Sequence, residues 1–269
     1  MFLNDVLILD RKSKLKSLPK IISKVRKAKY DIVVNAHRFG SSGLITWLSG
    51  AKKKFGFDEN TFSFCYTNTF EHNIGNGEHE VERNHKLLSD FITEPVSKPK
   101  LYPTTKDFEK VKQKKQYMVM APASVWFTKQ LPVQKWIELI NNQPIDVDVK
   151  LIGAPSDKDF CANIIKQTNE AENLAGKLSL LQSAALMQNA KMNFVNDSAP
   201  LHLCASVNAP VTAFFCSTVP EFGFTPLSDF SKLIEVDAKL DCRPCGLHGH
   251  KECPKGHFKC GNLINIDGL

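Results

Sequence analysis

Residues 193–215 read NFVNDSAPLHLCASVNAPVTAFF, and this stretch determines the expected fold. It begins with a short apolar strand, Asn193–Val195, and continues with a helix that starts at Ser198. It ends with a second apolar strand, Val211–Phe215. Apolar strands that alternate with helices are typical of a parallel sheet covered by helices on both faces. The stretch therefore predicts an α/β fold.

The same alternation extends outward through residues 116–269, which we expect to form one Rossmann-like domain. No internal repeat interrupts it, and Pro132 is well placed to open a helix. The further elements expected in this part are strands at Tyr117–Ala121 and Val147–Ile152, and helices at Val133–Asn141, Asp157–Thr168 and Ser179–Asn189.

Residues 1–93 show a similar pattern, which predicts a second Rossmann-like domain. The elements expected there are strands at Leu7–Leu9, Lys29–Asn35 and Lys54–Phe57, and helices at Ser17–Ala28, Gly43–Leu48 and Glu80–Phe91. Residues 94–115 contain three prolines and seven lysines, with little apolar periodicity beyond a short helix near Asp107. This composition is typical of an interdomain linker.

Composition and charge limit the possible classes of protein. The chain has 269 residues and 42% hydrophobic residues, as a globular protein does, and no apolar run approaches the ~20 residues of a membrane-spanning helix. The first residues lack the order of charge and apolarity of a signal peptide, so we expect a cytoplasmic protein.

The formal net charge is +7, and many of the basic residues lie between positions 11 and 29. One interpretation is a solvated helix face, and the other is attraction to a polyanion, either nucleic acid or a phosphorylated membrane surface. No motif for reading RNA or DNA supports a nucleic-acid partner.

Ligands of such sheets bind beyond the carboxyl ends of the strands, so the loops after Met120, Ile152, Val195 and Phe215 carry the candidate site. In the first loop, Ser124 offers a hydrogen bond and Lys129 offers a positive charge to phosphate. An ordinary loop with a surface lysine explains the same residues, because this is not a Walker loop.

The second loop contains Gly153, which permits a tight exit from the strand, and Asp157. Asp157 either caps the next helix or meets a ribose hydroxyl. In the third loop, Asp197 and Ser198 precede a helix whose first amides form an anion site, and His202 lies on the same helix face as Ser198. A capping aspartate and a core histidine remain the alternative.

The fourth loop carries Ser217 and Thr218, which suit either a phosphate or a turn. Four such loops on one rim predict an anionic, nucleotide-like ligand. No G-x-G-x-x-G motif is present, which disfavours a dinucleotide enzyme that transfers hydride.

These residues resemble the ADP-heptose:lipopolysaccharide heptosyltransferases, which form glycosyltransferase family 9. The motifs that carry the resemblance, in order, are Pro122-Ala-Ser with Lys129, Pro132 and Trp136; Leu151-Ile-Gly153; Asn173-Leu-Ala-Gly-Lys-Leu-Ser-Leu180; Asn196-Asp-Ser-Ala-Pro-Leu-His202; Pro210-Val-Thr-Ala-Phe-Phe-Cys-Ser-Thr218; Cys242-Arg-Pro-Cys245; and Cys253-Pro-Lys-Gly-His-Phe-Lys-Cys260.

The resemblance implies a GT-B architecture of two Rossmann-like domains and an inverting displacement that uses neither a metal nor another cofactor. It also implies a nucleotide-sugar donor such as ADP-heptose, and a lipid-linked saccharide acceptor at the inner face of the cytoplasmic membrane. We expect a monomer without a nucleic-acid partner. The residues to which it gives roles are Lys129 and Asp197 in catalysis, and Ser124, Lys129, Gly153, Asp157, Leu178, Asp197, Ser198, Ala199 and His202 in donor binding.

The first half departs from the family pattern. Family members begin with a strand and a Gly-Asp loop whose aspartate is the proposed base, and this chain has no such unit. The explanations are a shortened gene model, which we favour, a different base, or an inactive relative that only binds nucleotide-sugar. His37 and Arg38 follow a strand end, so they are candidates for acceptor contact, although a loop without a role explains them equally.

Four cysteines near the end, Cys242, Cys245, Cys253 and Cys260, have the spacing C-x2-C-x7-C-x6-C. The first pair would make half of a zinc site, but the second pair is too widely spaced for a standard zinc ribbon. We expect structural thiols or disulfides and no metal. A zinc-stabilised, basic nucleic-acid-binding protein is the alternative function.

Overall fold

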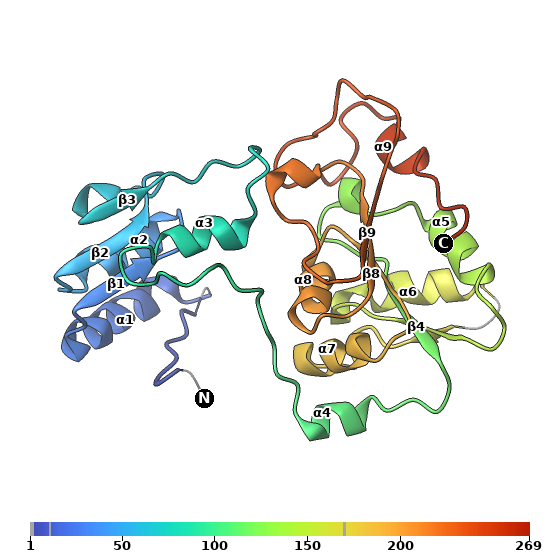
Figure 1. Ribbon diagram of the computed structural model, residues 1–269, viewed down its shortest axis with the longest axis horizontal. Helices are drawn as coiled ribbons and strands as arrows, with labels where there is room; N and C mark the ends of the chain where they lie inside the picture. Colours follow the sequence, from blue (N-terminus) through green and yellow to red (C-terminus); the bar gives the residue numbers. More distant parts are fainter. Residues whose placement is uncertain (1–2, 11, 169–170) are drawn as a thin grey trace. The chain divides into compact units, whose positions relative to one another are not determined.

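The computed structural model describes residues 3–10, 12–168 and 171–269. The chain divides into two compact units, residues 1–96 and residues 97–269 (Figure 1), and each is described here by itself. Most of the predicted linker therefore belongs to the second unit. In the described part of the chain, no helix is both long and apolar enough to cross a membrane.

The first unit contains a parallel sheet of strand order β1-β2-β3. Its strands are β1 (Ile32–Asn35), β2 (Lys53–Phe57) and β3 (Asn68–Phe70), and its helices are α1 (Lys14–Ala28), α2 (Gly40–Leu48), α3 (Glu80–Lys86) and the 3-10 turn η1 (Ser63–Cys65). Helix α1 packs against α2, and α2 packs against β1.

Three expectations for the first unit need correction. Leu7–Leu9 is not a strand, because no neighbouring strand pairs with it, and Ile8 is 83% exposed. The helix expected over Glu80–Phe91 ends at Lys86, and the chain turns at Leu87, whose side chain is buried. The strand expected from Lys29 starts at Ile32, because Lys29 has a φ of 53° and terminates α1.

The second unit is built on a six-stranded parallel sheet of order β6-β5-β4-β7-β8-β9. The strands are β4 (Tyr117–Ala121), β5 (Asp148–Leu151), β6 (Glu172–Asn173), β7 (Asn193–Asn196), β8 (Val211–Phe215) and β9 (Ser231–Glu235). Every residue of β4, β7 and β8 is buried, which explains the largely apolar sequences of β4 and β8; β7 buries Asn193 and Asn196 on either side of Phe194 and Val195.

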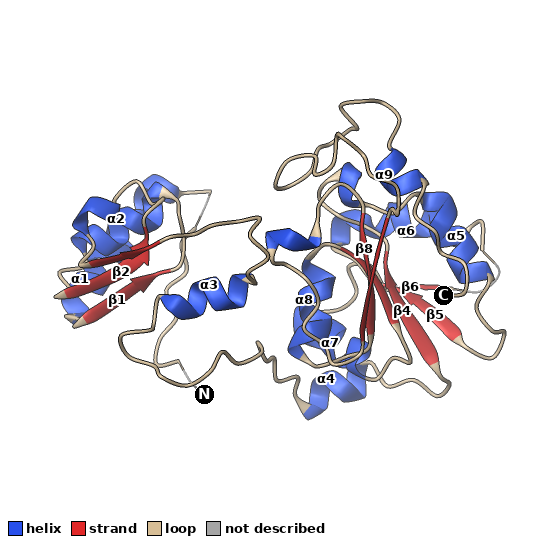
Figure 2. Cartoon of the chain, turned by 45° about the horizontal axis from the view of Figure 1, so that its top comes forward, coloured by secondary structure: helices blue, strands red, loops and turns tan. Residues whose placement is uncertain are grey.

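Helices cover both faces of this sheet, as Figure 2 shows. The helices and 3-10 turns are α4 (Thr105–Lys110), η2 (Phe127–Lys129), α5 (Val133–Asn141), η3 (Pro155–Asp157), α6 (Lys158–Ile165), α7 (Leu180–Gln188), α8 (Ala199–Ser206), η4 (Pro220–Phe222) and α9 (Lys259–Asn262).

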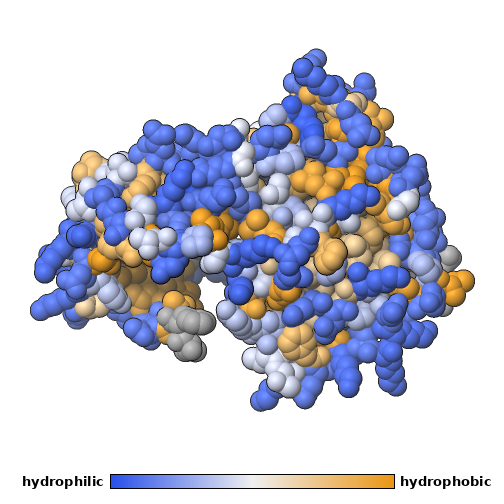
Figure 3. All heavy atoms as spheres, viewed as in Figure 1, coloured by the Kyte–Doolittle hydropathy of each residue, from blue (hydrophilic) through white to orange (hydrophobic). Residues whose placement is uncertain are grey.

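The core of the second unit consists of two apolar layers. Met120, Leu151 and Phe214 point to the layer that holds Trp136 of α5. Val119 and Val195 point to the opposite layer, with residues of α7 and α8. Alternate residues of a strand thus serve opposite layers. Hydrophilic residues cover most of the visible surface (Figure 3), so the apolar residues have been drawn into these layers.

Short or polar elements escaped prediction. Strand β6 has two residues and exists through its pairing with β5, and β9 pairs along its length with β8. Helix α4, by contrast, coincides with the short helix expected near Asp107; it starts at a Thr104 cap and packs against α7.

Candidate functional site

The four loops that were predicted to carry the site leave the same edge of the second sheet. Strands β4, β5, β7 and β8 are parallel neighbours, so the residues after Ala121, Leu151, Asn196 and Phe215 lie at their carboxyl ends. This is the edge at which parallel α/β sheets bind ligands.

Lys129 and Asp197, from two of these loops, form an ion pair. Lys129 Nζ lies 2.6 Å from Asp197 Oδ2, and the two side chains are 15% and 8% exposed. The hydroxyl of Thr218, from a third loop, donates to the same carboxylate oxygen at 2.6 Å. Side chains from three loops therefore converge on one buried carboxylate.

Asn196 fixes the loop that carries Lys129. This buried side chain donates from Nδ2 to the carbonyl of Pro122 at 2.9 Å, and its Oδ1 accepts from the amide of Leu131 at 2.9 Å. The Asn196 side chain thus forms hydrogen bonds with both ends of the loop. The sequence marked Asn196 as part of a motif without revealing this contact.

Thr128 and Ser217 join the first loop to the fourth. The Ser217 hydroxyl donates to Thr128 Oγ1 at 3.0 Å, and the amide of His250 donates to the same oxygen at 2.8 Å. Gly249 has a φ of +78°, and a Cβ atom there would lie 2.8 Å from Thr128 Oγ1. The C-terminal segment therefore packs directly behind Lys129, and nothing in the sequence pattern predicts this.

Arg243, between the first two clustered cysteines, anchors the same segment. It donates to the backbone carbonyls of Cys216 at 2.8 Å and Thr218 at 2.8 Å, and it pairs with Glu235 at 2.6 Å. These bonds hold the chain on either side of Ser217, and so fix the hydroxyl of Thr218 near Asp197.

Helix α8 begins directly after Asp197. Ser198 is its N-cap in extended conformation, and its hydroxyl donates to the Asn196 carbonyl at 3.3 Å. Ala199 is the first helical residue, a position where alanine fits well. His202 is exposed on this helix, with its ring centroid 6.4 Å from that of Phe224. The first amides of α8 provide positive electrostatic potential beside the ion pair.

The remaining predicted donor residues lie at the same edge. Asp157 is the N-cap residue of α6, but its side chain makes no capping hydrogen bond to that helix, so this part of the prediction is wrong. Its carboxylate accepts instead from the preceding amide of Ala154 at 2.8 Å, at the start of η3, and a Cβ at Gly153 would lie 2.9 Å from the Asp157 Cβ. Leu178 is half-buried against the second apolar layer. The carbonyl of Ser124 accepts from Gln130 Nε2 at 2.7 Å. None of these residues joins the Asp197 cluster through a described hydrogen bond.

His37 and Arg38 lie in the first unit, after β1. His37 Nδ1 lies 3.3 Å from the hydroxyl of Ser42, and Arg38 lies 4.0 Å from Glu59.

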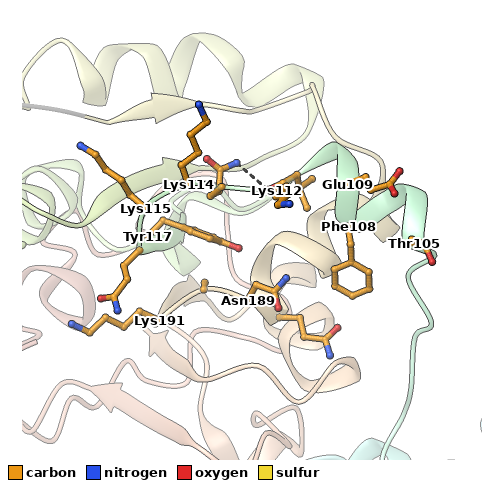
Figure 4. Close-up of a pocket in the computed structure, with 14 residues that line it drawn as sticks. Thr105, Phe108, Glu109, Lys112, Lys114, Lys115, Tyr117, Asn189 and Lys191 are labelled. Atoms are coloured by element: carbon orange, nitrogen blue, oxygen red, sulfur yellow. Dashed lines mark hydrogen bonds between the residues drawn. The ribbon is translucent and has the colours of Figure 1, made fainter.

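A cavity of about 890 Å³ lies away from these loops (Figure 4), at the opposite end of the strands. Tyr117 lines it and is the first residue of β4, whereas the candidate site follows the last, Ala121. The basic side chains around it are those of Lys112, Lys114, Lys115 and Lys191.

The four clustered cysteines are free thiols. Cys242 Sγ lies 3.9 Å from His257 Nε2, and burial raises the pKa of the Cys260 thiol to about 11. Within residues 3–10, 12–168 and 171–269, no three His, Cys, Asp or Glu residues are grouped so as to hold a metal ion.

Comparisons with known proteins point in one direction. The sequence model of glycosyltransferase family 9 (heptosyltransferase) matches residues 19–255. Lipopolysaccharide heptosyltransferase 3 of Escherichia coli is 26% identical over 213 residues, which are 74% of this chain and 63% of that protein. Lipopolysaccharide heptosyltransferase 1 of Pseudomonas aeruginosa is 23% identical over 234 residues, 82% of this chain and 63% of that protein. The chain thus spans less than two thirds of the length of these relatives.

Solved structures share the fold. The structure of E. coli ADP-heptose LPS heptosyltransferase II matches with a TM-score of 0.72 at 19% identity, over 86% of this chain and 78% of that chain. A glycosyl transferase family 9 structure from Veillonella parvula matches with a TM-score of 0.73 at 17% identity, over 83% and 68%. The predicted α/β fold of GT-B type, with two parallel sheets, is confirmed.

Proposed function

Because the family model covers residues 19–255, the chain belongs to glycosyltransferase family 9, and we propose that it transfers heptose from ADP-heptose to a lipopolysaccharide core acceptor. The names of the similar proteins support this choice of donor and acceptor class. The reaction that we propose is an inverting displacement at the heptose C1.

One observation supports the proposal most strongly, namely the cluster of Lys129, Asp197 and Thr218 at the carboxyl edge of the second sheet. The cluster joins a cation, a carboxylate and a helix start within one small region. A nucleotide-sugar presents both a diphosphate and sugar hydroxyls, so it matches such a mixed site in charge and hydrogen bonding.

The chemistry assigns Lys129 to the leaving group. In the displacement, the bond between the heptose C1 and the phosphate oxygen of ADP breaks, and the electron pair departs with that oxygen. The acceptor hydroxyl attacks C1 from the opposite face and loses its proton to a base. Negative charge grows on the diphosphate, where Lys129 and the first amides of α8, at Ser198 and Ala199, would stabilise it.

Asp197 would contact the donor sugar. Its carboxylate is held by Lys129 and Thr218, so its orientation is fixed before the donor arrives. A preoriented carboxylate accepts hydrogen bonds from sugar hydroxyls without further ordering cost. His202, exposed one turn along α8, would lie beside the diphosphate.

The other donor contacts follow from the neighbouring loops. Ser124 would bind the diphosphate or the sugar, and Gly153, Asp157 and Leu178 would lie near the base and ribose. Asp157 already accepts the Ala154 amide through Oδ2, and its Oδ1 accepts from the Ser156 hydroxyl at 3.2 Å. A ribose hydroxyl would therefore compete with Ser156 for Oδ1.

The acceptor would bind the first unit, with His37 and Arg38 as contacts. We propose a lipid-linked saccharide, met by the monomeric protein at the inner face of the cytoplasmic membrane. The formal net charge of +7 supports approach to an anionic surface.

The direct experiment combines the full chain with ADP-heptose and a deacylated lipopolysaccharide core oligosaccharide. Mass spectrometry of the products should show the oligosaccharide extended by one heptose and an equal amount of ADP. Release of ADP without extension would indicate hydrolysis, and neither product would contradict the proposal. ADP binding without either product would favour a relative that only binds nucleotide-sugar.

A further inference from the structure

The first unit carries a second cluster of polar side chains at the carboxyl edge of its own sheet. Arg38 follows β1, Glu59 follows β2 and His72 follows β3, each two or three residues beyond the strand end. Buried Asn60 ties two of these loops together, because its Nδ2 donates to the His37 carbonyl at 2.7 Å. The cluster therefore lies where parallel sheets bind ligands.

Glu80 anchors the buried side of this cluster. His72 Nε2 lies 3.0 Å from its Oε2, Arg83 Nε donates to the same oxygen at 2.9 Å, and Asn84 Nδ2 donates to Oε1 at 3.1 Å. Arg83 is fully buried and also donates to the backbone carbonyls of Glu78 and Asn73. Glu80 is thus held on several sides, and it fixes the orientation of the His72 ring.

The other nitrogen of His72 lacks a hydrogen-bond partner among the described residues. The side chain is 10% exposed, and Nδ1 faces Glu59 Oε2 at 3.8 Å, which is too long for a hydrogen bond. The ring also packs on Phe57, with centroids 4.4 Å apart, so it cannot turn away without losing that contact. A buried polar atom is normally satisfied, so Nδ1 indicates a missing ligand atom.

A hydroxyl group is the ligand atom that fits this position. If Nδ1 carries a proton, it donates to the hydroxyl oxygen, and the hydroxyl donates to Glu59. If Nδ1 carries none, the hydroxyl donates to Nδ1, and a neighbouring hydroxyl of the same sugar donates to Glu59. A phosphate oxygen would instead be repelled by the carboxylate of Glu59.

The surroundings suit a saccharide. Glu59 and Arg38, which lie 4.0 Å apart, are 46% and 36% exposed, so the carboxylate that faces the buried Nδ1 is itself open to solvent. Phe39 beside them is 56% exposed, and the Arg38 guanidinium lies 5.6 Å from its ring centroid. Carboxylate and guanidinium bind sugar hydroxyls, and an exposed aromatic ring packs against the C–H face of a sugar.

Resting on the function proposed above, we propose that Glu59, His72 and Arg38 form a subsite that binds a hydroxyl pair of the saccharide acceptor. His72 is the fixed element, held by Glu80, and Glu59 is the exposed element that closes on the sugar. The subsite adds Glu59 and His72 to the acceptor contacts expected at His37 and Arg38.

The test measures binding of a deacylated lipopolysaccharide core oligosaccharide to the full chain by titration calorimetry. Glu59→Gln keeps the shape of an exposed side chain and removes its charge, and Asp58→Asn makes the same change at the preceding exposed residue. His72→Gln tests the fixed element. We expect Glu59→Gln and His72→Gln to weaken binding about tenfold or more, and Asp58→Asn to change it less than about twofold.

ADP binding, measured on the same samples, separates this inference from the proposed function. All three variants should bind ADP as the unaltered chain does, which also shows that they are folded. Unchanged saccharide affinity in Glu59→Gln would overturn the subsite, as would an unaltered chain that binds ADP but no saccharide. The unaltered chain could bind the saccharide and yet transfer no heptose. If the Glu59→Gln and His72→Gln variants then lost saccharide binding, the subsite would be supported and the proposed function rejected.

Discussion

Lys129 and Asp197 are joined by an ion pair of 2.6 Å that connects the loop after β4 to the loop after β7. Both side chains are largely buried, so the two charges depend on each other. Removing one partner of a buried pair leaves the other charge uncompensated and costs more than the pair itself contributes. The same contact therefore affects both stability and the proposed chemistry.

Lys129→Met should lower both the stability of the protein and the rate of heptose transfer. Without the cation, Asp197 retains the Thr218 hydroxyl, and we expect a loss of about 3 kcal/mol in the free energy of unfolding. The rate of heptose transfer should fall about 100-fold or more, because charge on the departing diphosphate loses its stabilisation. Urea denaturation and the transfer assay measure the two effects.

Lys191→Met is the matched control, because it removes an exposed lysine from the opposite end of the strands. It should leave the free energy of unfolding and the rate of heptose transfer almost unchanged. Equal transfer rates in the two variants would exclude Lys129 from the reaction.

Thr218→Val should destabilise the protein by about 1–3 kcal/mol, because a buried carboxylate loses a hydrogen bond from a side chain of equal size. Thr212→Val makes the same change on β8, where the buried hydroxyl lies 3.7 Å from the Met192 sulfur and makes no other described hydrogen bond. The control should cost less than about 1 kcal/mol. Equal midpoints of urea unfolding would show that the contact with Asp197 contributes nothing.

Gly249→Ala should be more harmful than Gly256→Ala. Both glycines have a positive φ, +78° and +70°, so each alanine pays about 1–2 kcal/mol for the left-handed backbone. Only at Gly249 would the new Cβ meet an atom, Thr128 Oγ1, at 2.8 Å, and Lys129 Cγ lies 3.1 Å away. The midpoint temperature of thermal unfolding should therefore be lower for Gly249→Ala than for Gly256→Ala. A lower midpoint for Gly256→Ala would contradict the packing of Gly249 behind Lys129.

Stability should fall above pH 9 because of buried thiols. Burial raises the pKa of the Cys161 thiol from its ordinary 9.0 to about 12, and nearby Asp157 adds to the rise. Between these values the unfolded chain releases a proton that the folded chain keeps, so rising pH favours unfolding. Each such thiol lowers the free energy of unfolding by up to about 1.4 kcal/mol per pH unit.

Cys161→Ala tests this directly. The variant should be less stable at pH 8 because of the cavity it leaves, but its stability should decline less steeply between pH 9 and pH 11. Urea denaturation across this range measures the slope. A slope identical to that of the unaltered chain would show that Cys161 ionises in the folded state.

The sequence predicted the central elements of the second unit well, because β4, β7 and β8 are buried along their length, β4 and β8 are mostly apolar, and β7 has the apolar centre Phe194-Val195. It missed β3, β6 and β9, which are short or partly polar and owe their conformation to a neighbouring strand. A strand at Leu7–Leu9 was wrong for the opposite reason, since an apolar run without a partner does not form a sheet.

For the candidate site, the loop positions were predictable and the contacts were not. Lys129 and Asp197 could be named because each follows a buried strand. The roles of Thr128, Gly249 and Arg243 depend on hydrogen bonds and packing between segments far apart in the chain, such as Thr128 with His250. No local pattern encodes such pairs.

Hydrogen–deuterium exchange of the full chain with and without ADP tests the central claim most directly. We predict slower exchange in residues 121–131, 196–202 and 215–218, at the carboxyl edge of the second sheet, and unchanged exchange in residues 111–116 and 188–191 around the basic cavity at the opposite edge. Protection confined to the basic cavity, or no protection in a folded chain, would contradict a donor site built around Lys129 and Asp197.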